Sequence, residues 1–142
     1  MLVVDASAVV ELLLVRSAAE GIERHIVAHD YMLHAPHLLD VEVLSALRRL
    51  VASGEASSAR AVEALSDLSD LPVERYPHDL LIRRAWELRD NFSAYDATYL
   101  ALAELLVADG SALLTADARF ARATRKHSRV DVLHVRDRHD SA

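Results

Sequence analysis

The chain contains no cysteine, which excludes a disulfide framework and any metal site built on thiolates. A reducing cytosol is compatible with this absence, and we expect a cytoplasmic protein. Proline and glycine occur only three times each among 142 residues, and no flexible linker, low-complexity tract or internal repeat is visible. We therefore predict a single domain over residues 1–142, long enough to bury a substantial core.

Aromatic residues make up only 5% of a chain that is 52% hydrophobic, so the core must consist mainly of Ala, Leu and Val. Long apolar runs are missing as well. The longest, YLALAELLVA, contains Glu104 and is too short to cross a bilayer. The first residues carry no positive side chain and reach an acid at Asp5, which is unlike a secretory signal. These features lead us to expect a soluble protein with no membrane partner.

Lysine is almost absent: Lys126 is the only one among 16 basic residues, and the net charge is −6. Residues 1–118 carry 9 basic and 19 acidic side chains, a balance of −10, whereas residues 119–142 carry 7 basic and 3 acidic, a balance of +4. This distribution suits a site where cations meet carboxylates beside a phosphate-binding patch. An ordinary surface with a basic tail is the simpler explanation of the charges alone.

Short apolar stretches alternate with helical patterns along the whole chain. Strands are predicted at 2–5, 32–36, 72–77, 112–117 and 130–135. Helices are predicted at 7–14, 17–28, 37–53, 55–69, 79–90, 94–109 and 118–126, with Gly54 and Gly110 as stop signals. This alternation predicts the α/β class, with a parallel sheet covered on both faces.

Four acidic residues are candidates for a functional site. In a parallel sheet, ligands bind beyond the carboxyl ends of the strands. Asp5 ends the first predicted strand and Asp117 follows the strand ALLT, so both should lie at that edge. Asp96 begins the helix 94–109, and Glu42 lies at the margin of the apolar face of the helix 37–53, where a residue can line a cleft.

Each of these acids also has a purely structural explanation. Asp5 and Asp117 could cap the helices that follow them, Asp96 matches the capping-box spacing with Ser93, and Glu42 could be a solvated glutamate. Together, however, carboxylates converging on one cleft would repel one another, and some would protonate unless a cation were bound. We predict an Mg²⁺ or Mn²⁺ site, because these ions prefer oxygen ligands and the eight histidines show no zinc-binding spacing.

Four segments, VVDASAVVELL, LLDVEVLSALRRL, SAYDATYLALAELL and LLTADARFARA, resemble the PIN-domain ribonucleases in order and spacing. The likeness is closest to the VapC-type toxins of bacterial toxin–antitoxin pairs, and residues 55–80 contribute least to it. The resemblance implies a three-layer α/β/α sandwich around a short parallel central sheet. The acidic residues of the family correspond to Asp5, Glu42, Asp96 and Asp117, and its hydroxyl positions to Ser7 and Thr115.

The resemblance further implies a metal-dependent endoribonuclease that hydrolyses RNA phosphodiester bonds. One or two Mg²⁺ or Mn²⁺ ions would be held by Asp5, Asp96 and Asp117, and Glu42 would hold a water on the metal or position the nucleophile. Ser7 and Thr115 would hydrogen-bond the carboxylates or such a water. The resemblance also implies a homodimer and a small VapB-type antitoxin whose tail covers the active site.

Two surfaces are predicted to make contacts. Four basic residues spaced along one helical face are predicted to bind the RNA backbone, although a solvated basic face explains them equally well: Arg119, Arg122, Lys126 and Arg129. The helix 37–53 carries apolar residues beyond one stripe, which indicates deep burial or an interface and predicts a homodimer. Those off the main stripe are Leu38, Val41, Leu44 and Val51.

Two alternatives remain open at this point. A receiver or phosphatase domain handles phosphate in a related fold, but a receiver needs a lysine after a late strand, whereas Lys126 lies in a helical stretch. A phosphatase of that type would have a second Asp where Ser7 stands. A non-catalytic interaction domain would instead use the acidic cleft to bind an Arg-rich partner. Incubation with RNA and Mn²⁺, with and without a chelator, distinguishes catalysis from binding.

Overall fold

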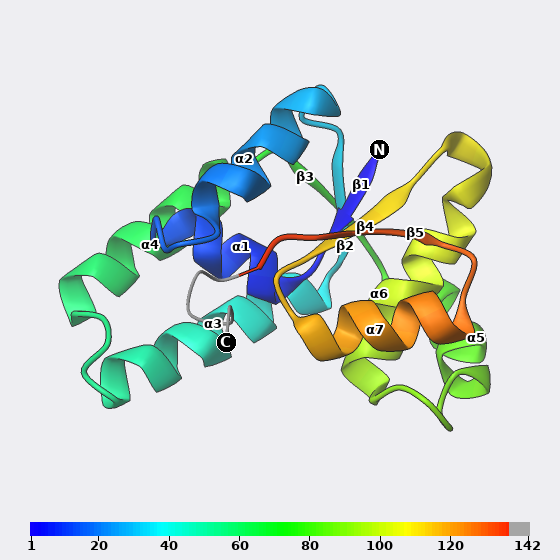
Figure 1. Ribbon diagram of the computed structural model, residues 1–142. Helices are drawn as coiled ribbons and strands as arrows, with labels where there is room; N and C mark the ends of the chain where they lie inside the picture. Colours follow the sequence, from blue (N-terminus) through cyan, green and yellow to red (C-terminus); the bar gives the residue numbers. More distant parts are fainter. Residues whose placement is uncertain (137–142) are drawn as a thin grey trace.

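The computed structural model describes residues 1–136 and contains, within them, a five-stranded sheet and seven α-helices (Figure 1). The strands are β1 (Leu2–Val4), β2 (Leu33–Pro36), β3 (Val73–Tyr76), β4 (Ala112–Thr115) and β5 (Asp131–His134). The helices are α1 (Ala6–Leu13), α2 (Ala19–Ala28), α3 (Leu38–Ala52), α4 (Ser58–Asp70), α5 (Ile82–Glu87), α6 (Ala94–Leu105) and α7 (Ala118–His127). The predicted order of strands and helices is confirmed.

The sheet is parallel throughout, with the strand order β3-β2-β1-β4-β5. The chain runs outward from β1 through β2 to β3 and then crosses to the other side of β1 to form β4 and β5. Val4 at the end of β1 pairs with Leu114 near the end of β4. The direction of winding therefore reverses between β1 and β4, and ligand sites of parallel sheets lie at the carboxyl ends of such a strand pair.

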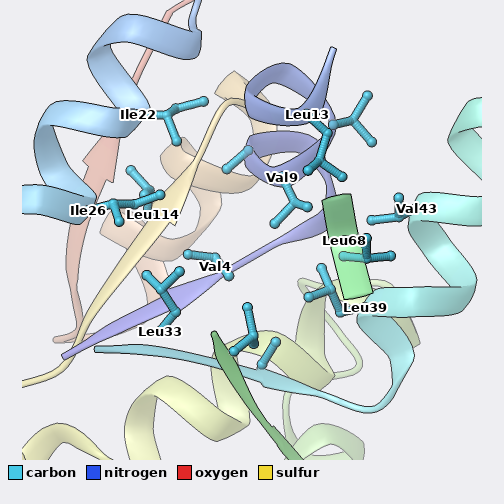
Figure 2. Packing of buried hydrophobic residues seen from close by; sticks show 14 of the residues in the cluster. Val4, Val9, Leu13, Ile22, Ile26, Leu33, Leu39, Val43, Leu68 and Leu114 are labelled. Atoms are coloured by element: carbon cyan, nitrogen blue, oxygen red, sulfur yellow. The ribbon is translucent and has the colours of Figure 1, made fainter. Parts of the chain in front are cut away.

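The two faces of the sheet are covered by different helices, which gives the predicted three layers (Figure 1). Side chains alternate between the faces along β1: Leu2 and Val4 pack with residues of α1 to α4, whereas Val3 packs with α5, α6 and α7. Figure 2 shows the first of these cores, in which Val4 and neighbouring strand residues face aliphatic side chains of the helices. The central strand is thus buried on both sides.

Side-chain caps fix the N-termini of four of the seven α-helices among the described residues. Asp5, Ser57, Ser93 and Asp117 cap α1, α4, α6 and α7 through their side chains. Gly110 adopts φ 78°, a conformation that favours glycine, as the sequence predicts for a stop signal. The predicted helices 94–109 and 79–90 are too long, because the backbone tightens into 3₁₀ turns at Val107–Asp109 and His78–Leu80.

The described residues bear on two further sequence predictions, the absence of a membrane span and the extent of the domain. No helix within residues 1–136 is long and apolar enough to span a membrane. The last six residues of the basic segment 119–142 lie outside the described residues. The single domain over residues 1–142 therefore stays a prediction.

Candidate active site

A cavity of about 750 Å³ lies where β1 and β4 end, and all four predicted acids line it. They come from separate elements: Asp5 follows β1, Glu42 lies in α3, Asp96 in the first turn of α6, and Asp117 precedes α7. The parallel sheet brings these positions together because its strand ends share one edge. We call this site the acid cavity.

Asp5 is both a helix cap and a buried charged group. The Ala8 N–H donates to its Oδ1 over 3.0 Å, and the Ser7 hydroxyl donates to the same oxygen over 2.7 Å. The Thr115 hydroxyl donates to Oδ2. Asp5 is only 5% exposed, and this burial raises its pKa from 3.8 to about 6 despite the hydrogen bonds, with a contribution from the Asp117 charge.

Ser7 and Thr115 hydrogen-bond a carboxylate, as predicted for the two hydroxyls. Thr115 is fully buried, and its Oγ1 accepts from the Asp117 N–H over 3.0 Å while donating to Asp5. Ser7 Oγ accepts from the Ala116 N–H over 3.0 Å. The two hydroxyls therefore connect the start of α1 to the turn between β4 and α7 and hold the Asp5 carboxylate in one orientation.

Asp117 caps α7 and still contributes its charge to the acid cavity. Its Oδ1 accepts from the N–H groups of Arg119 and Phe120 at 2.9 and 3.2 Å. The side chain is exposed and lines the acid cavity, and its negative charge helps to raise the pKa of Asp96. The structural explanation of this residue is correct, and it does not exclude a functional role.

The Asp96 carboxylate forms no hydrogen bond or ion pair within residues 1–136. The Asp96 N–H donates to the Ser93 hydroxyl over 3.1 Å, but no reciprocal capping-box bond from the Asp96 side chain occurs among residues 1–136. Burial raises its pKa from 3.8 to about 6, and the charges of Asp117, Asp5 and Glu42 add to this increase. The carboxylate is thus half-buried among three like charges, with the Arg119 charge as an opposing neighbour.

Glu42 occupies the marginal position that its helical phase predicts. It projects from α3 into the acid cavity, next to the buried stripe of Leu39, Val43 and Leu47. Burial raises the pKa of Glu42, and the nearby Tyr99 hydroxyl and then the Arg49 charge partly offset this increase. Its carboxylate is therefore a stronger base than that of a solvated glutamate.

Tyr99 also lines the acid cavity, although the sequence pattern does not mark it as a site residue. It lies one helical turn after Asp96, is 1% exposed, and its hydroxyl makes no hydrogen bond of standard geometry within the described residues. Burial and then the negative charge of Glu42 raise the pKa of Tyr99 above its usual range. The three-residue spacing from Asp96 was the available signal, but an aromatic residue in an apolar helix is ordinarily part of the core.

Two arginines also line the acid cavity. Arg16 is ion-paired with Glu11 and Glu55, at 3.6 Å in each case. Arg49 donates to the Ser45 hydroxyl over 3.3 Å and forms no ion pair among residues 1–136. Arg49 is therefore a cation of this cavity that remains available for a ligand.

The carboxylates suit a hard divalent cation held with water rather than a fully enclosed metal site. Among the described residues, no three His, Cys, Asp or Glu side chains are grouped closely enough to hold one ion together. Mg²⁺ typically retains several waters and is bound by one or two carboxylates together with substrate phosphates. The oxygen donors, their shared negative charge and the unused Asp96 carboxylate fit such an ion.

Three of the four basic residues predicted to bind RNA along one helical face lie on α7. α7 ends at His127, where the chain becomes extended, so Arg129 lies beyond the helix and the prediction of one face is wrong for it. Arg119 lies close enough to Asp96 for its charge to lower the pKa of that carboxyl. Lys126 and Arg129 line one further cavity, and Arg122 lines another.

The apolar residues of α3 beyond its main stripe fall into two groups. Leu38 and Val51 are partly buried and pack against the two cores, so they are not free for an interface. Val41 and Leu44 are 64% and 53% exposed. Only this second pair remains as a candidate contact surface.

Known proteins share both the sequence and the fold of this chain. The PIN domain family matches residues 2–126, a span that contains all four acids and both hydroxyl residues. VapC ribonuclease Mb0985 of Mycobacterium bovis is 46% identical over 121 residues, which cover 85% of this chain and 89% of that protein. Ribonuclease VapC12 of Mycobacterium tuberculosis is 34% identical over 133 residues, covering 94% and 99% of the two chains.

The crystal structure of PAE2754 from Pyrobaculum aerophilum superposes on this fold with a TM-score of 0.62 and 27% identity. The match covers 92% of this chain and 81% of that one. These relationships set aside the receiver and phosphatase alternatives, because the match includes the segments that carry the acids. The chain belongs to the PIN-domain family and, within it, to the VapC ribonucleases.

Proposed function

We propose that this protein is an endoribonuclease toxin that hydrolyses RNA phosphodiester bonds with Mg²⁺ or Mn²⁺ in the acid cavity. The names of its relatives, VapC ribonuclease Mb0985 and ribonuclease VapC12, support the ribonuclease activity. The chemistry of the acid cavity supports the metal requirement. We further propose that the protein acts in the cytoplasm.

The Asp96 carboxylate is the observation that carries this proposal. It is half-buried beside three other acids, its pKa is raised to about 6 although the nearby Arg119 charge lowers it, and within residues 1–136 it forms no side-chain hydrogen bond or ion pair. Keeping such a group ionised at neutral pH costs free energy, which a bound cation would offset. A purely structural acid would instead be expected to have a hydrogen-bond donor or a basic partner.

The residues divide the catalytic work as follows. Asp5, Asp96 and Asp117 would hold the cation, one or two of them by direct contact and the others through water, and when bound it would neutralise phosphate charge and lower the pKa of a water. Ser7 and Thr115 hold the Asp5 carboxylate in place through their hydroxyl groups. The Glu42 carboxylate orients the attacking water and accepts its proton, since a raised pKa makes it a better base.

The experiment that tests the function measures cleavage of end-labelled RNA by pure protein with Mn²⁺, with and without excess chelator. We expect cleavage by wild type only with the metal, and none by Asp96→Asn. Asp67→Asn on α4 is the matched control, because Asp67 is an exposed acid outside the acid cavity, and it should cleave normally. Cleavage in excess chelator, or at the wild-type rate by Asp96→Asn, would contradict the proposal.

Binding of an Arg-rich peptide without any cleavage would favour the non-catalytic alternative.

The proposal includes a homodimer and a VapB-type antitoxin whose tail enters the acid cavity. The exposed pair Val41 and Leu44 supports an apolar contact beside that cavity, because Val41 also lines it. Replacing both by Asp should weaken this contact without unfolding the protein, since neither side chain is buried. Sedimentation should therefore show a dimer for wild type and a monomer for the double variant; a wild-type monomer at micromolar concentration would contradict the dimer.

The RNA contacts in this proposal also include the basic residues around α7. Arg119 is the best placed of them, because its charge acts on Asp96 at the edge of the acid cavity. Arg122, Lys126 and Arg129 would reach phosphates farther from the cleaved bond. Carboxylates alone would repel RNA, so the substrate needs neighbouring positive charge to bind.

A further inference from the structure

A second cavity lies next to the acid cavity at the start of α7. It measures about 370 Å³ and is lined by Arg122 and Arg125 of α7, His134 of β5, Arg136 and Ala118. No acidic side chain lines it within the described residues. We call it the basic cavity.

The two cavities share one edge of the sheet. Asp117 lines the acid cavity, and the next residue, Ala118, lines the basic cavity. Across the sheet, His134 pairs in register with Thr115, whose hydroxyl donates to Asp5. A polynucleotide whose cleaved phosphate occupies the acid cavity would therefore have adjoining backbone close to the basic cavity.

The three arginines of the basic cavity carry charges that no described acid neutralises by an ion pair, and Arg125 donates only a long hydrogen bond of 3.4 Å to the Val132 carbonyl. Three arginines elsewhere each form a close ion pair, namely Arg60 with Glu63 at 3.2 Å, Arg75 with Asp40 at 2.7 Å and Arg84 with Glu104 at 2.6 Å. Within residues 1–136, no ion pair involves Arg122, Arg125 or Arg136. Three positive charges around one cavity repel each other, and an anion would relieve this repulsion.

His134 adds an independent indication of a ligand. Its Nε2 is buried and has no hydrogen-bond partner among the described residues. Buried polar atoms are nearly always paired in folded proteins, with protein groups or with a bound molecule. Protonated at Nε2, the imidazole would donate an N–H to an oxyanion held among the guanidinium groups.

From these observations we infer that the basic cavity binds a non-cleaved phosphate of the RNA backbone. The inference rests on the proposed function, because it assigns a second contact to the same substrate. Guanidinium groups bind phosphate oxygens in a bidentate manner, and such contacts position a nucleic acid without reading its sequence. The acid cavity performs the chemistry, and the basic cavity supplies affinity and register.

RNA binding by a non-cleaving protein tests this assignment. In an Asp96→Asn background, fluorescence anisotropy with a single-stranded RNA oligonucleotide gives Kd at several salt concentrations. The triple variant Arg122→Gln, Arg125→Gln, Arg136→Gln should bind about tenfold more weakly, and its salt slope should fall by about 1, as for one lost phosphate contact. The matched control replaces three exposed helical arginines that form no ion pair in the described chain: Arg24→Gln, Arg48→Gln, Arg83→Gln. It should change Kd less than about twofold.

A second measurement distinguishes RNA from free phosphate. Inorganic phosphate at constant ionic strength should raise the Tm of wild type more than that of the cavity variant, and circular dichroism confirms that both are folded. If phosphate binds selectively while RNA binding is unchanged, the ligand is a free anion and the RNA assignment is overturned. Equal weakening by both triple variants would also overturn it, because general charge would then explain the effect.

Failure of this inference can be separated from failure of the proposed function. If wild type cleaves RNA with Mn²⁺ but the cavity variant binds RNA as the control does, the basic cavity is not a substrate site and the ribonuclease stands. If no divalent cation supports cleavage but the cavity variant alone loses RNA affinity, the phosphate site stands and the catalytic proposal fails.

Discussion

The acid cavity and the basic cavity adjoin at the start of α7 but hold their charges in different ways. Asp5 is nearly fully buried and fixed by three hydrogen bonds, whereas the arginines of the basic cavity are exposed. Burial raises the pKa values of Asp5 and Asp96 to about 6, so ionising them costs free energy that a cation would recover. The exposed guanidinium groups remain solvated and can bind an anion at little desolvation cost. The first arrangement suits precise chemistry, and the second suits adaptable binding.

The largest expected effect is the loss of kcat in Asp96→Asn, set against a change in KM in the basic-cavity variant. Asp96→Asn should lower kcat by about 100- to 1000-fold or more, because it removes a charge needed in the transition state. The triple arginine variant of the basic cavity should mainly raise KM, with kcat nearly unchanged. Steady-state cleavage of a short RNA measures both constants. A large loss of kcat in the arginine variant would show that the two cavities do not divide their roles in this way.

Loss of the Thr115 hydroxyl that holds Asp5 should reduce cleavage less than loss of one of the acids. Thr115→Val preserves shape but removes the hydroxyl that donates to Asp5 and accepts from the Asp117 N–H. We expect cleavage to fall by about 10- to 100-fold, as for other residues that orient a metal ligand. Thr124→Val is the matched control, because Thr124 is fully buried in α7 and its hydroxyl has no partner among the described residues. Equal activity of the two variants would show that the Thr115 hydroxyl does not help to position Asp5 for cleavage.

The stability of the metal-free protein should depend on pH through the acid cavity. The pKa values of Asp5 and Asp96 rise from 3.8 to about 6 on folding, so the folded state binds these protons more tightly than the unfolded state. This stabilisation is complete below about pH 4 and is lost as pH rises through about 6. Mn²⁺ binds the ionised form, so it should raise Tm little at pH 5 and clearly at pH 7.5. Thermal unfolding at both pH values measures this difference, and equal Tm increases would place the ion elsewhere.

The smallest expected effect concerns Tyr99. Tyr99→Phe removes a buried hydroxyl that faces Glu42 without a standard hydrogen bond in the described chain. Stability should change by less than about 1 kcal/mol, because no well-formed bond is lost. If the hydroxyl orients Glu42, the pH profile of kcat should shift while KM stays constant. An unchanged profile would leave Tyr99 as a packing residue of α6.

Local patterns in the sequence were sufficient for the helices and strands and for the identity of the four acids. Helix caps and glycine stops depend on hydrogen bonds within a few residues. The sequence alone therefore predicts Asp5 and Asp117 as possible caps and Gly110 as a stop signal. Helix lengths were less predictable, since the last turns of α6 depend on how the chain enters β4. Their apolar pattern continues to Val107, although the α-helix ends at Leu105.

The sequence by itself therefore determined which residues carry charge, which residues cap α1 and α7, and which acids follow strands. Only the tertiary structure decided which of these charges meet. Ser7 accepts from Ala116, 109 residues away, because β1 and β4 are neighbouring strands. The basic cavity likewise exists because β5 pairs with β4 and brings His134 and Arg136 to the arginines of α7. Strand order is a property of the whole folded chain, and no local spacing between these residues encodes it.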